Sequence, residues 1–319
     1  MNRFLLLGVI IILTFTVSSA RAEKEVQLSL ATGWTGGVYY ALGRVMAGIL
    51  SQYIPYADIK AEETEGIVNN CLMVNTRKVD LALVRADIGW DAFHGKGKFK
   101  EKIPLRAVSA LFPSSMHIVT LEGTGIEKVS DLKGKRVSMG FPGSGTEVKA
   151  RRVLEAYGLD PDRDMKRYRL GPSESASALK DKKIDAYFWC GGLPTASLTD
   201  LGLSPGIKIK LIAHADAIPK MVEKYGPLYV KGIVPAKTYP GQDGSVPIAV
   251  VWNLLVCTEK MKGDLVYDIV KTLFDHKPEL VKVHREARWF SLERQEESSP
   301  IPFHSGAIRY FTEKGLKIK

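Results

Sequence analysis

Apolar residues along the chain recur with two spacings, one typical of strands and one typical of helices. Residues 26–30 alternate between apolar and polar side chains, as in a strand with one buried face. Residues 42–50 carry apolar side chains at helical intervals, which predicts one buried face of a helix. Residues 81–84 are uninterruptedly apolar, which is typical of a strand buried on both faces.

The same alternation continues toward the end of the chain. Further strands are expected at residues 106–112, 117–121, 137–139, 184–189, 209–213 and 248–256. Further helices are expected around residues 67–74, 150–157 and 265–273. Repeated strand-helix units of this kind predict an α/β fold with parallel sheets.

Glycines gather at four places where a predicted strand ends and a helix begins. These turns are residues 32–37, 63–66, 140–146 and 191–194. In an open α/β sheet the ligand crevice lies outside the carboxyl ends of the strands, and helix N-termini favour an anion there. Any single turn of this kind is equally well explained as a helix cap, but four of them favour one shared crevice for a negatively charged ligand.

The N-terminus has the pattern of a secretory signal peptide. Arg3 is followed by an apolar run over residues 4–17, and Ala20-Arg21-Ala22 is a cleavage signal. The run has 14 residues, whereas a membrane span needs about 20. We therefore expect residues 1–22 to be removed and the protein to be periplasmic or otherwise extracytoplasmic; the alternative is an uncleaved N-terminal anchor.

The charge balance does not change this picture. The chain has 319 residues with 45 Lys and Arg against 35 Asp and Glu, a formal charge of +10. The basic residues are dispersed, and their denser clusters at 96–102 and 133–136 contain no aromatic platform beyond Phe99, so we predict no nucleic-acid partner. Cys71, Cys190 and Cys257 lie among apolar residues and are expected to be buried hydrophobes rather than a disulfide framework.

Catalytic motifs are scarce. Pro142 stands where a G-x-S-x-G motif around Ser144 would need its first glycine, and no H-E-x-x-H is present. The six histidines show no metal-ligand spacing. Residues 37–43 resemble a phosphate-binding loop only loosely, since Arg44 stands where Lys is needed. We therefore expect no enzyme activity, no cofactor and no metal.

Seven motifs, in order along nearly the whole chain after residue 22, resemble the TAXI subgroup of TRAP-transporter solute-binding proteins. They are residues 35–43 (TGGVYYALG), 63–70 (ETEGIVNN), 80–87 (DLALVRAD), 131–137 (DLKGKRV), 142–146 (PGSGT), 192–194 (GLP) and 302–310 (PFHSGAIRY). The order and spacing of the motifs, together with the signal peptide, carry the resemblance.

The resemblance implies a two-lobed α/β fold of the type II periplasmic-binding-protein kind, with a ligand cleft between the lobes. It implies that the protein captures a small organic anion, such as a carboxylate like glutamate or 2-oxoglutarate, and delivers it to ion-coupled TRAP membrane permease subunits. On this basis we expect the signal peptide at 1–22, lobe 1 at 23–111, lobe 2 at 112–250, and the return of lobe 1 with C-terminal helices at 251–319. Residues 112–119 and 248–256 are expected to act as hinges. The alternative is an exported enzyme or sensor domain for a small carboxylate on the same scaffold.

The position of residues at these turns, with the resemblance, predicts ten ligand-binding residues. They are Gly37, Tyr39, Thr64, Gly66, Asn70, Arg85, Gly143, Ser144, Gly145 and Thr146. For Tyr39 the alternative is a packing role.

Three positions depart from the family's usual residues. Ile67 and Ala86 replace hydroxyl side chains, and Arg85 replaces a neutral amide. Arg85 follows the buried run 81–84, so it is expected at the carboxyl end of a strand, where its planar guanidinium suits a carboxylate. The alternative is that Arg85 pairs internally with Asp87 or a nearby glutamate.

Overall fold

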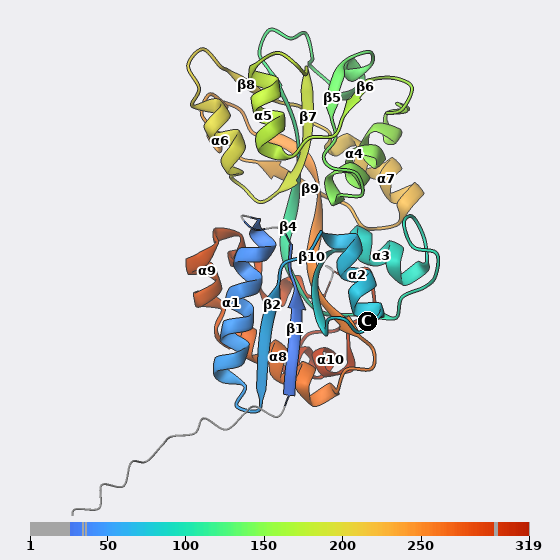
Figure 1. Cartoon of the computed structure of the whole chain (residues 1–319), viewed down its shortest axis with the longest axis vertical. Helices are drawn as coiled ribbons and strands as arrows, with labels where there is room; N and C mark the ends of the chain where they lie inside the picture. Colours follow the sequence, from blue (N-terminus) through green and yellow to red (C-terminus); the bar gives the residue numbers. More distant parts are fainter. Residues whose placement is uncertain (1–25, 34, 36, 297–298, 319) are drawn as a thin grey trace, which may run out of the picture.

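The computed structural model describes residues 26–318, except 34, 36 and 297–298. The predicted signal peptide at 1–22 lies outside the described residues. Two α/β lobes are stacked along the long axis of the molecule, and two long strands run through both of them (Figure 1). The predicted two-lobed α/β fold is thereby confirmed.

Ten strands of the described residues form one sheet in the order β2-β1-β3-β10-β4-β7-β5-β6, with β8 paired to β4 and β9 paired to β10. The strands are β1 (Val26–Ala31), β2 (Ala57–Glu62), β3 (Leu81–Arg85), β4 (Leu105–Leu121), β5 (Arg136–Ser138), β6 (Lys166–Tyr168), β7 (Ala186–Gly191), β8 (Ile209–Leu211), β9 (Val230–Val234) and β10 (Val246–Thr258). The prediction of parallel sheets is confirmed for the outer strands and wrong for the central ones. The outer strands pair in parallel, but β10 and β4 are antiparallel to each other, and β10 to β3 and β4 to β7 are antiparallel too.

Helices cover the sheet in both lobes. The α-helices are α1 (Val38–Tyr53), α2 (Ile67–Asn75), α3 (Ala86–His94), α4 (Gly145–Ala156), α5 (Pro172–Lys180), α6 (Ala196–Gly202), α7 (Ile218–Tyr225), α8 (Gly263–Asp275), α9 (Lys277–Val283) and α10 (Ser305–Glu313). Helices α1–α3 and α8–α10 belong to the lobe that holds β1–β3, and α4–α7 belong to the other (Figure 1). Among the helices that the structure describes, none combines the length and the hydropathy of a membrane-spanning segment.

Strands β4 and β10 connect the lobes. Strand β10 pairs with β9 over Val246–Val250 and with β3 over Asn253–Cys257, and its register with β4 shifts between Trp252 and Leu254. Because its partner changes there, this part of β10 is where the chain passes from one lobe to the other. We propose these crossings as the lobe boundaries, with lobe 1 at 23–111 and 251–319 and lobe 2 at 112–250.

The two separate strands expected at 106–112 and 117–121 are one strand, β4. Pro113 and the serines after it suggest a break in the sequence, but Pro113 lies opposite Trp252, and β10 continues to pair beyond it. Proline lacks an N–H to donate, so one ladder hydrogen bond is lost at this point without ending the strand.

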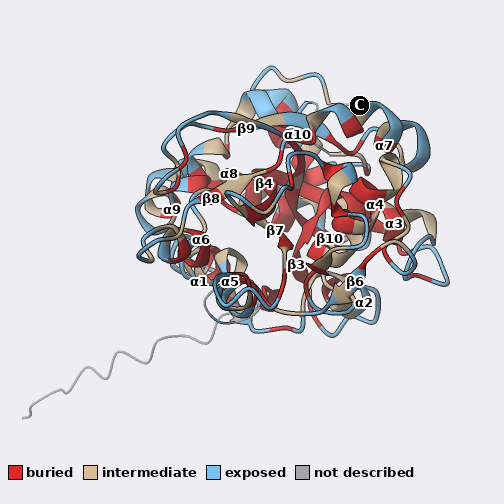
Figure 2. Cartoon of the chain, turned by 90° about the horizontal axis from the view of Figure 1, so that it is seen from above, coloured by how far each residue is buried: buried red, intermediate tan, exposed pale blue. Residues whose placement is uncertain are grey.

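The hydrophobic core follows the central strands. Buried residues are concentrated around β3, β4, β7 and β10 when the molecule is viewed along its long axis (Figure 2). The helical face predicted within residues 42–50 is the buried face of α1, with Leu42, Met46 and Leu50 at most 3% exposed. Cys71 and Cys257 are buried as expected, whereas Cys190 is only partly buried.

Candidate functional site

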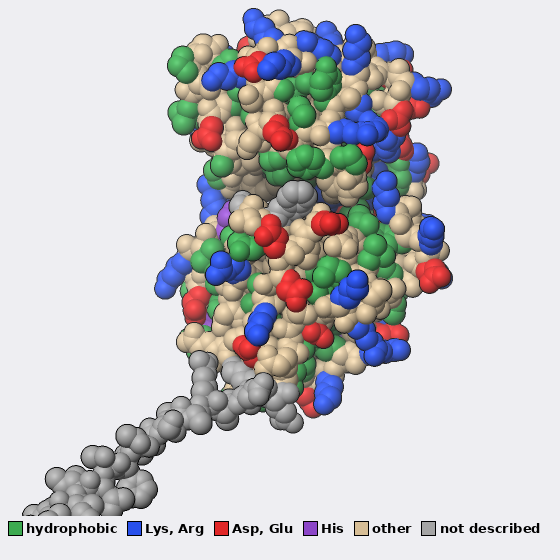
Figure 3. Space-filling view, viewed as in Figure 1, with side chains coloured by type: hydrophobic (Ala, Val, Ile, Leu, Met, Phe, Trp, Pro, Cys, Tyr) green, Lys and Arg blue, Asp and Glu red, His purple; other side chains and the backbone are tan. Residues whose placement is uncertain are grey.

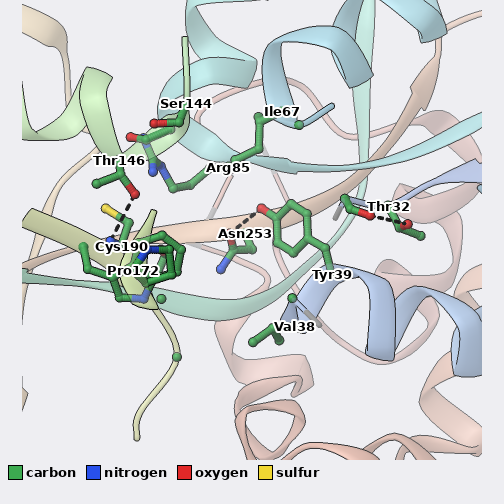
Figure 4. A pocket seen from close by; sticks show the side chains of 18 of the residues that line it. Thr32, Val38, Tyr39, Ile67, Arg85, Ser144, Thr146, Pro172, Cys190 and Asn253 are labelled. Carbon is green, nitrogen blue, oxygen red and sulfur yellow. Dashed lines mark hydrogen bonds between the residues drawn. The ribbon is translucent and has the colours of Figure 1, made fainter. Parts of the chain in front are cut away.

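A cavity of about 530 Å³ lies between the lobes. Figure 3 shows the surface hollowed between the upper and lower halves of the molecule, and Figure 4 shows the cavity from close by. The N-termini of α1 and α2 line it from lobe 1, and those of α4 and α5 line it from lobe 2. Residues of the two connecting strands β4 and β10 complete the wall.

Seven of the ten predicted residues line this cavity. They are Gly37, Tyr39, Gly66, Arg85, Ser144, Gly145 and Thr146. They come from both lobes, so the structure brings together segments that are more than 100 residues apart in the sequence. Their role in binding a ligand remains a prediction.

The other three predicted residues do not line the cavity. Asn70 is fully buried behind it, where its Nδ2 donates to the carbonyl oxygens of Thr32 and Leu83, both at 2.8 Å. The Thr64 hydroxyl donates to Asn70 Oδ1 at 2.6 Å. These two side chains therefore hold the loops of lobe 1 in place, because their polar atoms satisfy neighbouring groups of the protein.

Gly143 is partly exposed in the turn before α4. Its φ of +74° is in the left-handed region that favours glycine, and its N–H donates to Glu147 Oε2 at 2.6 Å. It shapes the turn before α4 without lining the cavity.

Arg85 is the buried cation of the site. It ends β3 and is 1% exposed, as expected for a residue at the carboxyl end of a strand. Its Nε and Nη2 donate to the two carboxylate oxygens of Asp87 at 2.7 and 2.8 Å, and Nη2 also donates to the Gly145 carbonyl at 2.7 Å. No hydrogen bond of Nη1 is found among the described residues, so Nη1 is available to a ligand.

Charge and burial shift the pKa values of Arg85 and Asp87 in opposite directions. Burial alone would raise the pKa of Asp87, but the charge and hydrogen bonds of Arg85 lower it to about 2. Burial alone would lower the pKa of Arg85, but the charge and hydrogen bonds of Asp87, together with smaller contributions from neighbouring groups, outweigh burial and hold that pKa above its ordinary value. Both groups are therefore charged at any physiological pH.

The start of α4 presents small polar groups to the cavity. Ser144 is the N-cap of the helix, and its hydroxyl accepts from the Glu147 N–H at 3.2 Å. The Thr146 hydroxyl accepts from the Cys190 N–H at 3.3 Å, which ties α4 to the end of β7 (Figure 4). The first N–H groups of an α-helix have no acceptor within the helix, so those of Gly145 and Thr146 are suited to an anion.

Tyr39 connects α1 to the two long strands. Its hydroxyl donates to Asn253 Oδ1 at 2.5 Å, and Asn253 Nδ2 donates to the Phe112 carbonyl at 2.8 Å (Figure 4). The Tyr39 ring meets the Phe112 ring edge to face, with centroids 6.2 Å apart. Tyr39 therefore both lines the cavity and packs, so the two readings of this residue are compatible.

The prediction missed most of the wall that lobe 2 and the long strands supply. These residues include Phe112, Ser114, Phe141, Pro172, Ser173, Trp189, Cys190 and Asn253. One signal was present in the sequence: Asn253 is a lone polar residue in the apolar run 248–256. A buried amide there needs hydrogen-bond partners, and such residues often belong to a site or its support. The partly buried Cys190 lies on this wall and is not the core residue that the sequence suggested.

A second group of charges joins the lobes next to the cavity. Arg152 of α4 forms an ion pair with Asp91 of α3, and its Nη1 donates to the Tyr229 hydroxyl at 2.8 Å. The Tyr229 hydroxyl donates in turn to Asp87 Oδ2 at 3.1 Å. The carboxylate that holds Arg85 is thus also held from lobe 2.

Lys149 of α4 supports the crossing strands. It is fully buried, and its Nζ donates to the carbonyls of Ser114 in β4 and Ala249 in β10 at 3.2 and 2.9 Å. Burial lowers the pKa of Lys149 to about 8. Within the described residues, no three His, Cys, Asp or Glu side chains are grouped as metal ligands.

Two α/β lobes with a ligand-sized cavity between them, joined by two long strands, have the architecture of the two-lobed periplasmic-binding-protein fold. The chain belongs to the NMT1-like family, whose model matches residues 30–315.

Solved structures share the fold at low sequence identity. A protein of Bordetella bronchiseptica RB50 superimposes with a TM-score of 0.52 at 17% identity, over 90% of this chain and 89% of that one. The alkanesulfonate-binding protein SsuA of Xanthomonas axonopodis pv. citri, bound to MOPS, has a TM-score of 0.50 at 19% identity, over 91% and 85% of the two chains. A periplasmic sulfonate-binding protein SsuA of Methylobacillus flagellatus KT has a TM-score of 0.50 at 13% identity, over 92% and 86%. At these identities the likeness shows the fold.

Proposed function

We propose that this chain is an extracytoplasmic solute-binding protein that captures a small organic anion between its lobes and delivers it to a membrane transporter. The observation that carries the proposal is the convergence of Arg85 and four helix N-termini on one cavity between the lobes. Each helix N-terminus carries a partial positive charge, and together with the guanidinium they favour a negatively charged group. A carboxylate suits the planar guanidinium of Arg85.

The composition of the cavity favours binding over catalysis. None of the described lining residues is a histidine, an aspartate or a lysine. The hydroxyl of Ser144 caps α4, and no base that would activate it is among its described hydrogen-bond partners. We therefore propose release of an unchanged ligand rather than an enzymatic or sensory role on the same scaffold.

The transporter is proposed from the sequence motifs. The seven ordered motifs resemble TAXI-type binding proteins, which implies ion-coupled TRAP permease subunits as the partner and ligands like glutamate or 2-oxoglutarate. One of the solved proteins with this fold is described instead as part of a sulfonate ABC transporter. An uptake assay distinguishes the two systems, because TRAP-type uptake depends on an ion gradient whereas ABC-type uptake depends on ATP.

Extracytoplasmic location is proposed from the predicted signal peptide and the fold. Fractionation of cells that produce the full chain is expected to place the mature protein outside the cytoplasm, shortened by about 22 residues. A full-length protein in the membrane fraction would support the N-terminal anchor instead.

The central experiment is recovery of the natural ligand. The mature protein, purified without denaturant, is unfolded, and the released small molecules are identified by mass spectrometry. We expect one small organic anion at near-equimolar amount, which rebinds in isothermal titration calorimetry and is recovered unchanged. Conversion of the added anion would instead indicate an enzyme, and the absence of any bound or rebinding small molecule would contradict the proposed function.

A further inference from the structure

The cavity has an unbalanced set of charges. Arg85 is the only cation among its described lining residues, and Glu65 is the only carboxylate. Glu65 is exposed at the start of α2, whereas Arg85 is almost completely buried. The nearest buried carboxylate, Asp87, does not line the cavity, and both of its oxygens accept hydrogen bonds from Arg85. No buried carboxylate of the described lining therefore faces a ligand.

The helix ends add to this imbalance. Helices α1, α2, α4 and α5 have at least nine residues each and begin at the cavity. Their N-terminal N–H groups and dipoles are positive toward the ligand. An ammonium group placed among them would lose its hydration and meet a partial positive charge at each helix end, which is costly in a desolvated site.

The remaining walls are largely apolar. Tyr39 and Phe112 meet edge to face on one side. Pro172 lies on the lobe 2 side, and Ile67 lies beside Arg85 (Figure 4). Trp189 of β7 also lines the cavity from lobe 2. A second acidic group on the ligand would have to leave water for these side chains without a second cation to receive it. An apolar body, in particular a ring, gains by burial against them.

We propose that the cavity selects organic acids that carry one anionic group on an uncharged, apolar body, and that it rejects α-amino acids. This inference rests on the proposed function and narrows its ligand class, because glutamate, which the resemblance implies, carries an ammonium group, and 2-oxoglutarate carries two carboxylates. The acidic group is placed at Arg85 Nη1 and the free N–H groups that begin α4, and the body is placed between Tyr39 and Trp189. Both carboxylates and sulfonates can supply this single anionic group.

The test uses compounds that differ by one group. The wild-type mature protein, unfolded and refolded to remove bound ligand, is titrated at pH 7 with 3-phenylpropionate, L-phenylalanine and benzylmalonate. The second compound adds an ammonium group, and the third adds a second carboxylate at the same carbon. The neutral 3-phenylpropanamide tests the need for an anion, and 2-phenylethanesulfonate distinguishes a sulfonate from a carboxylate. Shorter single acids, from acetate to hexanoate, and L-glutamate complete the panel.

We expect single acids to bind, and L-phenylalanine, benzylmalonate and the amide each to bind about 10-fold or more weakly than 3-phenylpropionate, because each adds an unpaired charge or removes the paired one. The matched control is Glu122→Gln, which removes an exposed carboxylate that does not line the cavity and is expected to leave the affinity for 3-phenylpropionate within about 2-fold.

Tighter binding of L-phenylalanine or L-glutamate than of every single acid would overturn the inference while leaving the solute-binding function intact. Failure of every single acid to bind would overturn it as well. Loss of amino-acid binding in Glu65→Gln would show that Glu65 receives an ammonium group, which is also the opposite of what we propose. The proposed function itself fails only if neither these compounds nor a co-purified molecule binds.

Discussion

Arg85 and Asp87 form a buried ion pair with two parallel hydrogen bonds, Nε to Oδ1 at 2.7 Å and Nη2 to Oδ2 at 2.8 Å. Neither side chain is more than 2% exposed. Nη1 of Arg85 takes no part in the pair and remains available at the cavity. Arg85 can therefore pair with Asp87 and bind a ligand at the same time. Because Asp87 fixes two of the three nitrogens, the third is presented in a fixed orientation, which lowers the entropy lost on binding.

Arg85→Gln is expected to weaken binding of the recovered anion by about 10- to 150-fold, the loss of one charge-assisted hydrogen bond of about 1.5–3 kcal/mol. It is also expected to lower the free energy of unfolding by about 3–5 kcal/mol, because Asp87 becomes a buried carboxylate without its partner. Calorimetric titration and urea unfolding measure the two effects.

The double variant Arg85→Gln/Asp87→Asn separates the effect on affinity from the effect on stability. It removes both charges, so most of the lost stability is expected to return while affinity stays low. Recovery of affinity in the double variant, or full affinity in the single variant, would assign Arg85 to structure alone.

Gly145→Ala is expected to weaken anion binding by about 10-fold or more, because the added methyl group would lie 2.7 Å from Arg85 Nη1 and 3.2 Å from Ile67 Cδ1. Arg85 cannot easily move aside, since Asp87 and the Gly145 carbonyl hold it. The control is Gly48→Ala, at an exposed position in α1 with open space around it, which is expected to stabilise the protein by about 0.5–1 kcal/mol. Equal affinities of the two variants in titration would show that Gly145 does not border the ligand.

Arg85 was predictable from the sequence because two local facts place it. An uninterrupted apolar run indicates a buried strand, and the residue after such a strand lies at the crevice of an open α/β sheet. The glycine turns at the cavity were predictable because they too follow predicted strands. Thr64 lies in one of these turns and Asn70 in the helix after it, yet the Thr64 hydroxyl donates to Asn70 Oδ1, and Asn70 Nδ2 donates to backbone carbonyls. The direction of a side chain depends on partners that are distant in sequence, so spacing alone does not reveal it.

The pairing of strands that are distant in sequence could not be predicted from local patterns. The strand-helix order was largely visible from periodicity, but the antiparallel pairing of β4 with β10 joins segments that are about 140 residues apart. The register of these two strands brings Asn253 into hydrogen-bond contact with Phe112 and Tyr39, and no local sequence pattern predicts these contacts. The ion pair of Arg152 with Asp91 is hidden for the same reason, since a charged residue on a helix face is usually solvated.

Arg152 and Asp91 connect the lobes without lining the cavity. A micromolar ligand supplies about 8 kcal/mol in total, and a full shift from an open to a closed state needs about 5.5 kcal/mol of differential binding. An interlobe pair that favours the closed state by only about 1.4 kcal/mol would change affinity tenfold. The pair is therefore expected to influence binding from a distance.

Arg152→Leu/Asp91→Leu removes the pair without leaving an unpaired charge at either position. We expect it to weaken anion binding by about 10-fold and to increase the radius of gyration of the ligand-free protein in small-angle scattering. Arg152→Leu alone is expected to be less stable than the double variant, because Asp91 stays buried without its partner. Unchanged scattering and affinity in the double variant would show that the pair does not hold the lobes together.

His117 of β4 is held as a neutral imidazole. It is 1% exposed, with Nδ1 3.3 Å from the Trp189 carbonyl and Nε2 2.8 Å from the Tyr239 hydroxyl. The Tyr239 hydroxyl accepts from the Thr195 N–H at 3.0 Å, which leaves its proton for Nε2. Burial lowers the pKa of His117 to about 4, and burial lowers the pKa of the fully buried His214 to about 4 as well.

The ligand-free protein is therefore expected to lose stability as the pH falls from about 6.5 to 4. In this window the unfolded chain binds protons at His117 and His214 that the folded chain does not, so the free energy of unfolding decreases by up to about 1.4 kcal/mol per pH unit for each histidine. His117→Gln retains a donor and an acceptor at this position. It is expected to reduce the dependence of the free energy of unfolding on pH by the contribution of one histidine, and His214→Gln is expected to do the same. Urea unfolding at intervals from pH 7.5 to 4.5 measures the slopes. A slope in either variant equal to that of the wild type would mean that the histidine is protonated in the folded state and does not drive acid destabilisation.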